Sequence, residues 1–97
     1  MQAALDLQRS AMVFKALGHP TRLTMVTALS DGERCVCELQ ALVGLDMSTV
    51  SKHLSVLTGV GVLAYEKRAN KVFYRLIRPC VLDLLTCLDA DAKGCSA

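Results

Sequence analysis

The chain has 97 residues, of which 53% are hydrophobic and 21% are charged, and its formal net charge is +2. This length gives one small domain, residues 1–97, with more apolar residues than so small a monomer can bury. No stretch approaches the roughly 18 consecutive apolar residues of a membrane span, and no basic stretch followed by an apolar run indicates a secretory leader. We therefore expect a cytoplasmic protein, with no membrane partner, that forms a homodimer.

The first part of the chain predicts two helices. The first covers residues 1–17 and ends at Gly18. Its buried stripe is expected to consist of Leu5, Met12, Val13, Ala16 and Leu17. The second covers residues 20–30 and begins with Pro20, whose missing N–H costs nothing at a helix start, and residues 31–32 break it. Its apolar face is formed by Leu23, Val26 and Leu29.

Two further helices follow closely. A short one covers residues 36–43 and ends at Gly44, and Asp46 is a suitable N-cap for the next. That helix ends at Gly59, and its apolar positions recur at spacings of three and four. They are Met47, Val50, Leu54 and Leu57.

A hairpin and a last helix complete the chain. Strands are expected at residues 62–65 and 72–77, with a turn around Asn70, which tolerates a left-handed backbone. The last helix covers residues 79–88, and residues 89–97 are expected to be a flexible tail. The last helix has an apolar run that is most simply a dimer interface. This run comprises Val81, Leu82, Leu84, Leu85 and Leu88.

The helices of residues 36–43 and 47–58 form a helix-turn-helix, and the hairpin after them is typical of a wing. The sequence therefore predicts a mainly α fold with a small β-hairpin, a winged helix-turn-helix. Residues 52–78 carry a net charge of +5 and the remainder −3, which suits a polyanion such as double-stranded DNA. A solvated polar face and a solvated hairpin are the alternatives.

The second helix of this pair offers small polar and basic side chains that can approach the major groove, and the wing offers bases for phosphates. The candidate DNA-contacting residues are Ser48, Thr49, Ser51, Lys52 and Ser55 on the helix, and Lys67, Arg68 and Lys71 on the wing.

Five cysteines are an odd number, and in a reducing compartment they favour ion binding over disulfides. Cys35 and Cys37 stand one residue apart, directly before the helix-turn-helix. Soft ions such as arsenite, antimonite, cadmium or lead bind several thiolates at once. The helix N-terminus and Arg34 are expected to favour the thiolate form. The alternative is that both cysteines are small buried residues.

Three motifs in this order resemble the ArsR/SmtB family of metal-responsive repressors, over residues 12–78. They are Leu17-Gly18-His19-Pro20-Thr21-Arg22-Leu23, Cys35-Val36-Cys37-Glu38-Leu39 and Ser48-Thr49-Val50-Ser51-Lys52-His53-Leu54. The resemblance implies a winged-helix homodimer, with the first and last helices in its interface, that binds a palindromic operator and releases it when an inducer binds. His53 falls in the DNA-binding motif, although a structural hydrogen-bonding role is favoured for both His19 and His53.

The Cys-Val-Cys segment looks most like the arsenite-responsive branch, which implies that Cys35 and Cys37 are the ligands. Residues two apart on a helix point about 200° apart, so ion binding is expected to distort the first turn. The third family cysteine is replaced by Gln40. The candidates for a third ligand are Cys80, Cys87 and Cys95, the first two of which could instead be packed core. A methylated trivalent arsenical would need only two thiolates.

The sequence therefore predicts a transcriptional repressor that releases DNA when trivalent arsenic or antimony binds, with no resident cofactor and no enzymatic activity. A cadmium- or lead-responsive repressor is an alternative, although its added N-terminal cysteine is missing before Cys35. A zinc site in the last helix is disfavoured because no histidine follows His53. Three further hypotheses are a thiol-redox switch on the same DNA-binding fold, a small thiol enzyme and a protein-interaction module.

Overall fold

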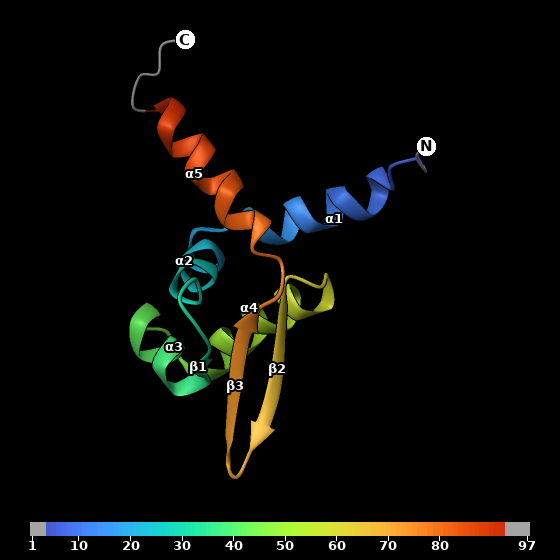
Figure 1. Cartoon of the computed structure of the whole chain (residues 1–97). Helices are drawn as coiled ribbons and strands as arrows, with labels where there is room; N and C mark the ends of the chain where they lie inside the picture. The colour runs from blue at the N-terminus through green and yellow to red at the C-terminus, as the bar shows by residue number, and fades with distance from the viewer. Residues whose placement is uncertain (1–3, 93–97) are drawn as a thin grey trace.

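The computed structural model describes residues 4–92 and shows a helical body from which a two-stranded wing projects (Figure 1). The elements are α1 (Leu7–Leu17), α2 (Pro20–Ala28), β1 (Arg34–Cys35), α3 (Val36–Val43), α4 (Met47–Gly59), β2 (Leu63–Arg68), β3 (Lys71–Leu76) and α5 (Cys80–Ala92). The strands form one antiparallel sheet in the order β1-β3-β2. This arrangement confirms the predicted winged helix-turn-helix. No helix within residues 4–92 is long and apolar enough to cross a membrane.

Local capping signals set the helix boundaries. Pro20 opens α2, and Gly44 ends α3 in a left-handed conformation with φ of 71°. The Asp46 carboxylate accepts hydrogen bonds from the Thr49 N–H at 3.1 Å and from the hydroxyls of Ser48 and Thr49. These bonds hold the pKa of Asp46 well below its usual range. The turn of the helix-turn-helix is therefore fixed by its own sequence.

The core lies between α2, α3, α4 and the base of the wing. Its fully buried side chains are Met25, Val26, Leu39, Val50, Leu54, Leu57, Val62 and Leu63. The predicted apolar faces of α2 and α4 are largely confirmed, but Met47 is 38% exposed, so its predicted burial is wrong. It stands at the first position of α4, one turn short of the core.

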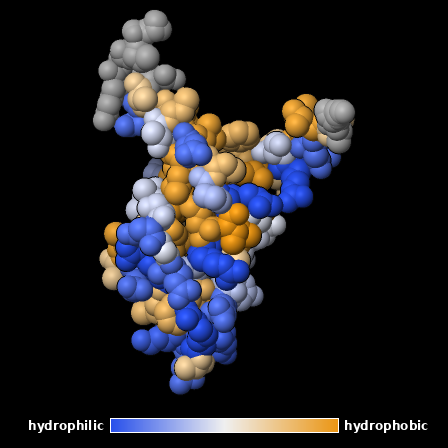
Figure 2. Space-filling model, in the orientation of Figure 1, coloured by the Kyte–Doolittle hydropathy of each residue, from blue (hydrophilic) through white to orange (hydrophobic). Residues whose placement is uncertain are grey.

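α1 and α5 leave the body as two diverging arms (Figure 1). Of the buried stripe predicted for α1, only Ala16 and Leu17 are buried in the single chain, and Leu5 and Met12 are exposed. Apolar residues gather in the angle between the arms, whereas the wing end is hydrophilic (Figure 2). α5 continues to Ala92, so the prediction that residues 89–92 are an unstructured tail is wrong, and residues 93–97 lie outside the described part.

Two features of the sheet differ from the prediction. The sequence did not indicate β1, because two residues are too few to show alternation; its register sets Arg34 opposite Tyr74 and Cys35 opposite Phe73. In the hairpin turn the left-handed residue is Ala69, with φ of 55°, and not Asn70. Through β1, the segment that carries the cysteines is part of the same sheet as the wing.

Candidate functional site

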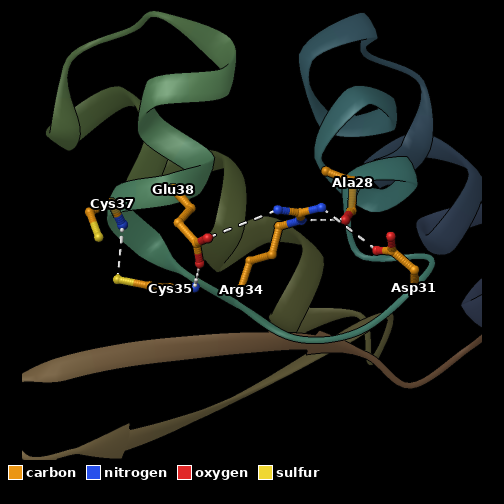
Figure 3. Close-up of polar contacts among 6 residues, drawn as sticks. All are labelled: Ala28, Asp31, Arg34, Cys35, Cys37 and Glu38. Carbon is orange, nitrogen blue, oxygen red and sulfur yellow. Dashed lines mark hydrogen bonds and ion pairs between the residues drawn. The ribbon is translucent and has the colours of Figure 1, made fainter.

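Cys35 and Cys37 lie where β1 turns into α3 (Figure 3). Cys35 is the N-cap of α3, with an extended backbone, and its Sγ accepts a hydrogen bond from the Cys37 N–H at 3.4 Å. The Glu38 carboxylate accepts in return from the Cys35 N–H at 2.9 Å, which completes a capping box with cysteine in the usual place of serine. Cys35 is 5% exposed, whereas Cys37 is open to solvent.

This geometry corrects the expected need for helix distortion. Cys35 precedes the helix, so the angle of about 200° between helical positions two apart does not apply to it. The extended backbone brings its Sγ within hydrogen-bonding reach of the Cys37 N–H, and the two side chains lie close enough to shift each other's pKa. Two sulfur ligands are therefore preorganised on one side of the backbone, with one of them accessible.

The two thiols have different acidities. The hydrogen bond from the Cys37 thiol lowers the pKa of Cys35 and raises that of Cys37, and the positive charge of Lys71 lowers both. Cys35 is thus the thiol that first becomes the nucleophilic or ion-binding thiolate. The pair is suited to binding one soft ion between a thiolate and a thiol that deprotonates on coordination.

Arg34 does not support the thiols as expected. Its Nε donates to the carbonyl oxygen of Ala28 at 2.7 Å, and its guanidinium pairs with Asp31 at 3.7 Å and Glu38 at 4.0 Å. The side chain points to α2, away from both sulfurs (Figure 3). The base that acts on the thiols is Lys71, which the sequence assigned to DNA alone; only the β1–β3 register reveals this proximity.

A third ligand is not supplied within the described part of one chain. No three His, Cys, Asp or Glu residues of positions 4–92 come together as a metal site. Cys80 and Cys87 are exposed on α5 in the single chain, so their burial as core would need a second copy, and α5 leaves the body at the end opposite to the wing (Figure 1). Cys95 lies outside the described residues.

The face of the sheet that carries Cys35 also carries Phe73 and Arg68 of the wing. Cys35 and Phe73 are cross-strand partners, so their side chains share a face. The Arg68 guanidinium lies 4.0 Å from the centre of the Phe73 ring and forms an ion pair with Glu33, just before β1. Arg68 therefore ties the wing to the cysteine segment, a role that the sequence did not indicate.

Some of the predicted DNA-contacting residues are exposed to solvent, whereas others are half-buried or hydrogen-bonded within the chain. On α4 the exposed members are Ser48, Ser51, Lys52 and Ser55. Thr49 and His53 are half-buried, and the Thr49 hydroxyl donates to Asp46. On the wing, strand alternation places Lys67 on the face opposite to Lys71 and Arg68.

His53 of α4 lies in a cluster of basic side chains with Arg22 and His19, which come from the start of α2. The Arg22 Nε–H donates to Nδ1 of His53 at 3.0 Å, and the rings of His53 and His19 lie 4.5 Å apart. The Nδ1 of His19 accepts from the Thr21 N–H at 3.1 Å and caps α2. Both histidines therefore have the structural hydrogen-bonding role that the sequence favoured. Burial, followed by the charges of His19 and Arg22, lowers the pKa of His53.

Stability is expected to decrease in mild acid through this histidine. Because the pKa of His53 in the fold lies below its ordinary value of 6.5, the unfolded chain binds the proton first. The free energy of unfolding should therefore be constant above that value and fall as the pH drops through the window below it. Denaturant titrations across about pH 5 to 7 measure this. The variant His53→Gln keeps an acceptor for Arg22 without titrating, so an equal loss in it would contradict the assignment.

A model of the bacterial regulatory protein arsR family matches residues 19–65. The biofilm growth-associated repressor of Xylella fastidiosa is 35% identical over 78 residues, which cover 80% of this chain and 68% of that protein. A homologue of the cadmium resistance regulator CadC from Staphylococcus aureus is 39% identical over 67 residues, 68% of this chain and 55% of that one.

The chain belongs to the ArsR family of transcriptional regulators. A solved structure from Mycobacterium bovis, the homodimeric winged helix-turn-helix DNA-binding domain of a possible ArsR-family regulator, superposes with a TM-score of 0.78 at 26% identity, covering 96% of this chain and 91% of that one. These ArsR relatives are regulators, which excludes the thiol-enzyme hypothesis. Their names refer to biofilm growth and cadmium resistance, so membership in the ArsR family does not assign the inducer.

Proposed function

We propose that this ArsR-family repressor is a homodimer that binds operator DNA and releases it when a trivalent arsenic or antimony ion binds Cys35 and Cys37. One observation carries the proposal: two thiols of different acidity stand together at the start of the first helix of the helix-turn-helix, where the Cys35 Sγ accepts a hydrogen bond from the Cys37 N–H at 3.4 Å. A soft ion on two thiolates fits this arrangement. A methylated trivalent arsenical fits best, since its methyl group takes the place of a third ligand.

The dimer is supported by the apolar surface between α1 and α5. A cleft of about 230 Å³ is lined by Phe14 and Leu17 of α1 and by Cys80, Val81 and Leu84 of α5, among others. The M. bovis relative is homodimeric, and a second copy is the simplest partner for this face. Two copies of α4 would then meet successive major grooves about 34–36 Å apart.

The route from the thiols to DNA runs through the sheet. An ion held by both thiolates changes the packing around the Cys35 side chain, and Cys35 is the residue that pairs with Phe73 of the wing. Phe73 supports Arg68, which also pairs with Glu33. Ion binding thus loosens β1 from β3 and moves the wing bases. A coupling of about 1–3 kcal/mol suffices for about 5–150-fold weaker DNA binding.

A cadmium-responsive repressor is a second candidate, favoured by the identity with the CadC homologue. Cadmium prefers more than two thiolates, so this candidate requires a ligand from Cys80, Cys87 or Cys95.

Titration of the reduced protein on labelled operator DNA tests the proposal. The operator is first selected from a random duplex library, and anisotropy is then followed with arsenite, methylarsenite, cadmium or peroxide. We expect release by the arsenicals at the lowest concentrations. Release by peroxide alone would establish the redox switch, and release by cadmium alone the second candidate. No DNA binding under any condition would identify an interaction module.

The variant Phe73→Ala tests the route through the sheet. It removes the side chain that lies between Cys35 and Arg68, so the ion should bind with unchanged affinity but release DNA several-fold less effectively. Arsenite affinity and DNA affinity are measured separately. Tyr65→Ala is the matched control, since Tyr65 contacts Tyr74 across the wing and does not face the cysteine. Full release by Phe73→Ala would show that the signal takes another path.

A further inference from the structure

We propose that the cleft between α2 and α4 binds a phosphate of the DNA backbone, with Arg22 as its fixed ligand and Lys52 as its mobile one. The cleft has a volume of about 520 Å³ and is lined by Arg22, Thr49, Lys52, His53, Ser55 and Val56. The residue contributed by α2 is Arg22, which sequence patterns did not single out as a DNA contact. The proposal rests on the winged helix-turn-helix fold and does not depend on the identity of the inducer.

The charge of the cleft favours an anion. None of the described residues that line it is acidic, and Arg22 has no carboxylate partner within residues 4–92. Arg22 stands in the first turn of α2, where a positive charge opposes the helix dipole, and α2 has no acidic residue there to offset it. A cation kept at an unfavourable position, beside His19 and His53, indicates a function in binding.

The guanidinium is also held in place. Its Nε donates to Nδ1 of His53 at 3.0 Å and its Nη1 donates to the carbonyl oxygen of Ala16 at 3.2 Å. These two bonds use two of the five N–H donors and leave three for another acceptor. A preorganised arginine of this kind loses little side-chain entropy when it binds a phosphate.

The position of the cleft suits the DNA backbone. Thr49, Lys52 and Val56 form one stripe of α4 at spacings of three and four, along the flank of the exposed serine face. When such a helix enters the major groove, the phosphates of the groove wall pass along its flanks. A phosphate there would lie between Arg22 and Lys52, and it would fix how deeply α4 enters.

Salt dependence on a labelled duplex of mixed sequence tests the proposal, since phosphate contacts do not need the operator. We expect Arg22→Gln to weaken duplex binding roughly tenfold for each charged contact that is lost. The slope of log affinity against log salt should decrease in magnitude by about 0.9 for each lost contact. A dimer loses two such contacts, one from each copy. Arg22→Lys keeps the charge but loses the fixed geometry, so its slope should stay close to that of the wild type. Arg9→Gln, which removes an equal charge from α1, should leave the slope unchanged.

Two results would overturn the proposal. A purely structural role predicts that Arg22→Gln and Arg22→Lys weaken binding alike, with lower melting temperatures and an unaltered salt slope. The second result comes from a titration of the free protein with inorganic phosphate, which measures whether the cleft binds this ion without DNA. Saturable binding of this ion that needs Arg22 and does not compete with the duplex would assign the cleft to a free anion instead of DNA. Absence of duplex binding by the wild type would instead count against the winged helix-turn-helix as a DNA reader.

Discussion

Replacing either Cys35 or Cys37 by serine is expected to abolish arsenite-induced release while leaving DNA affinity unchanged. Each change removes one of the two sulfurs that the start of α3 brings together. Serine oxygen is a poor ligand for a soft ion, so the coupling of about 1–3 kcal/mol should disappear, and with it the 5–150-fold loss of DNA affinity. Anisotropy titrations with arsenite, run beside the wild type, measure this.

The fold should survive these substitutions, which makes the result interpretable. Serine is among the best N-cap residues, so Cys35→Ser keeps the acceptor for the backbone of α3, whereas Cys35→Ala should lose about 1 kcal/mol of stability. Cys87→Ser is the matched control, because it removes an exposed thiol from α5. If both serine variants of the pair still respond and Cys87→Ser does not, the ion site lies on α5.

Phe14→Asp is expected to convert the dimer to monomers and to weaken operator binding by at least a hundredfold. Phe14 is 59% exposed in the single chain and lines the cleft between α1 and α5. Two unpaired carboxylates would be buried where the copies meet, at a cost of several kcal/mol. A monomer also loses the avidity of two linked half-sites, which contributes about 10²–10⁴ in affinity.

Sedimentation equilibrium and anisotropy on the selected operator measure these two effects. Phe14→Leu keeps the apolar contact and should remain dimeric. Circular dichroism should be unchanged in both variants, because Phe14 is outside the buried core. A Phe14→Asp protein that remains dimeric with full affinity would place the interface on another face.

Local signals in the sequence determined most of the elements. Pro20, Gly44 and Asp46 act on their own helix ends, and the apolar spacing of α4 selects Val50, Leu54 and Leu57 for the core. Such signals act within one or two helical turns, so they can be interpreted without knowing the fold. The order of these elements was sufficient to predict a winged helix-turn-helix.

The candidate site was predicted only in part. Cys35 and Cys37 stand out by their spacing, but their unequal acidity depends on an extended residue at position 35, which a helical interpretation of the segment concealed. Of the bases near them, Arg34 was expected to act on the thiols and Lys71 was expected only to contact DNA. Arg34 is adjacent in sequence yet points to α2, and Lys71 acts on the thiols through a sheet register that no local pattern specifies.

Sequence alone thus determined which elements form and which residues carry thiols and charge, because capping, periodicity and residue chemistry are local. The tertiary structure alone decided which of them meet. It joined the cysteine strand to the wing through Phe73 and Arg68, and it set Arg22 of α2 against His53 of α4. These contacts link positions about 30 or more residues apart, and the packing of the core fixes them rather than any preference of the residues themselves.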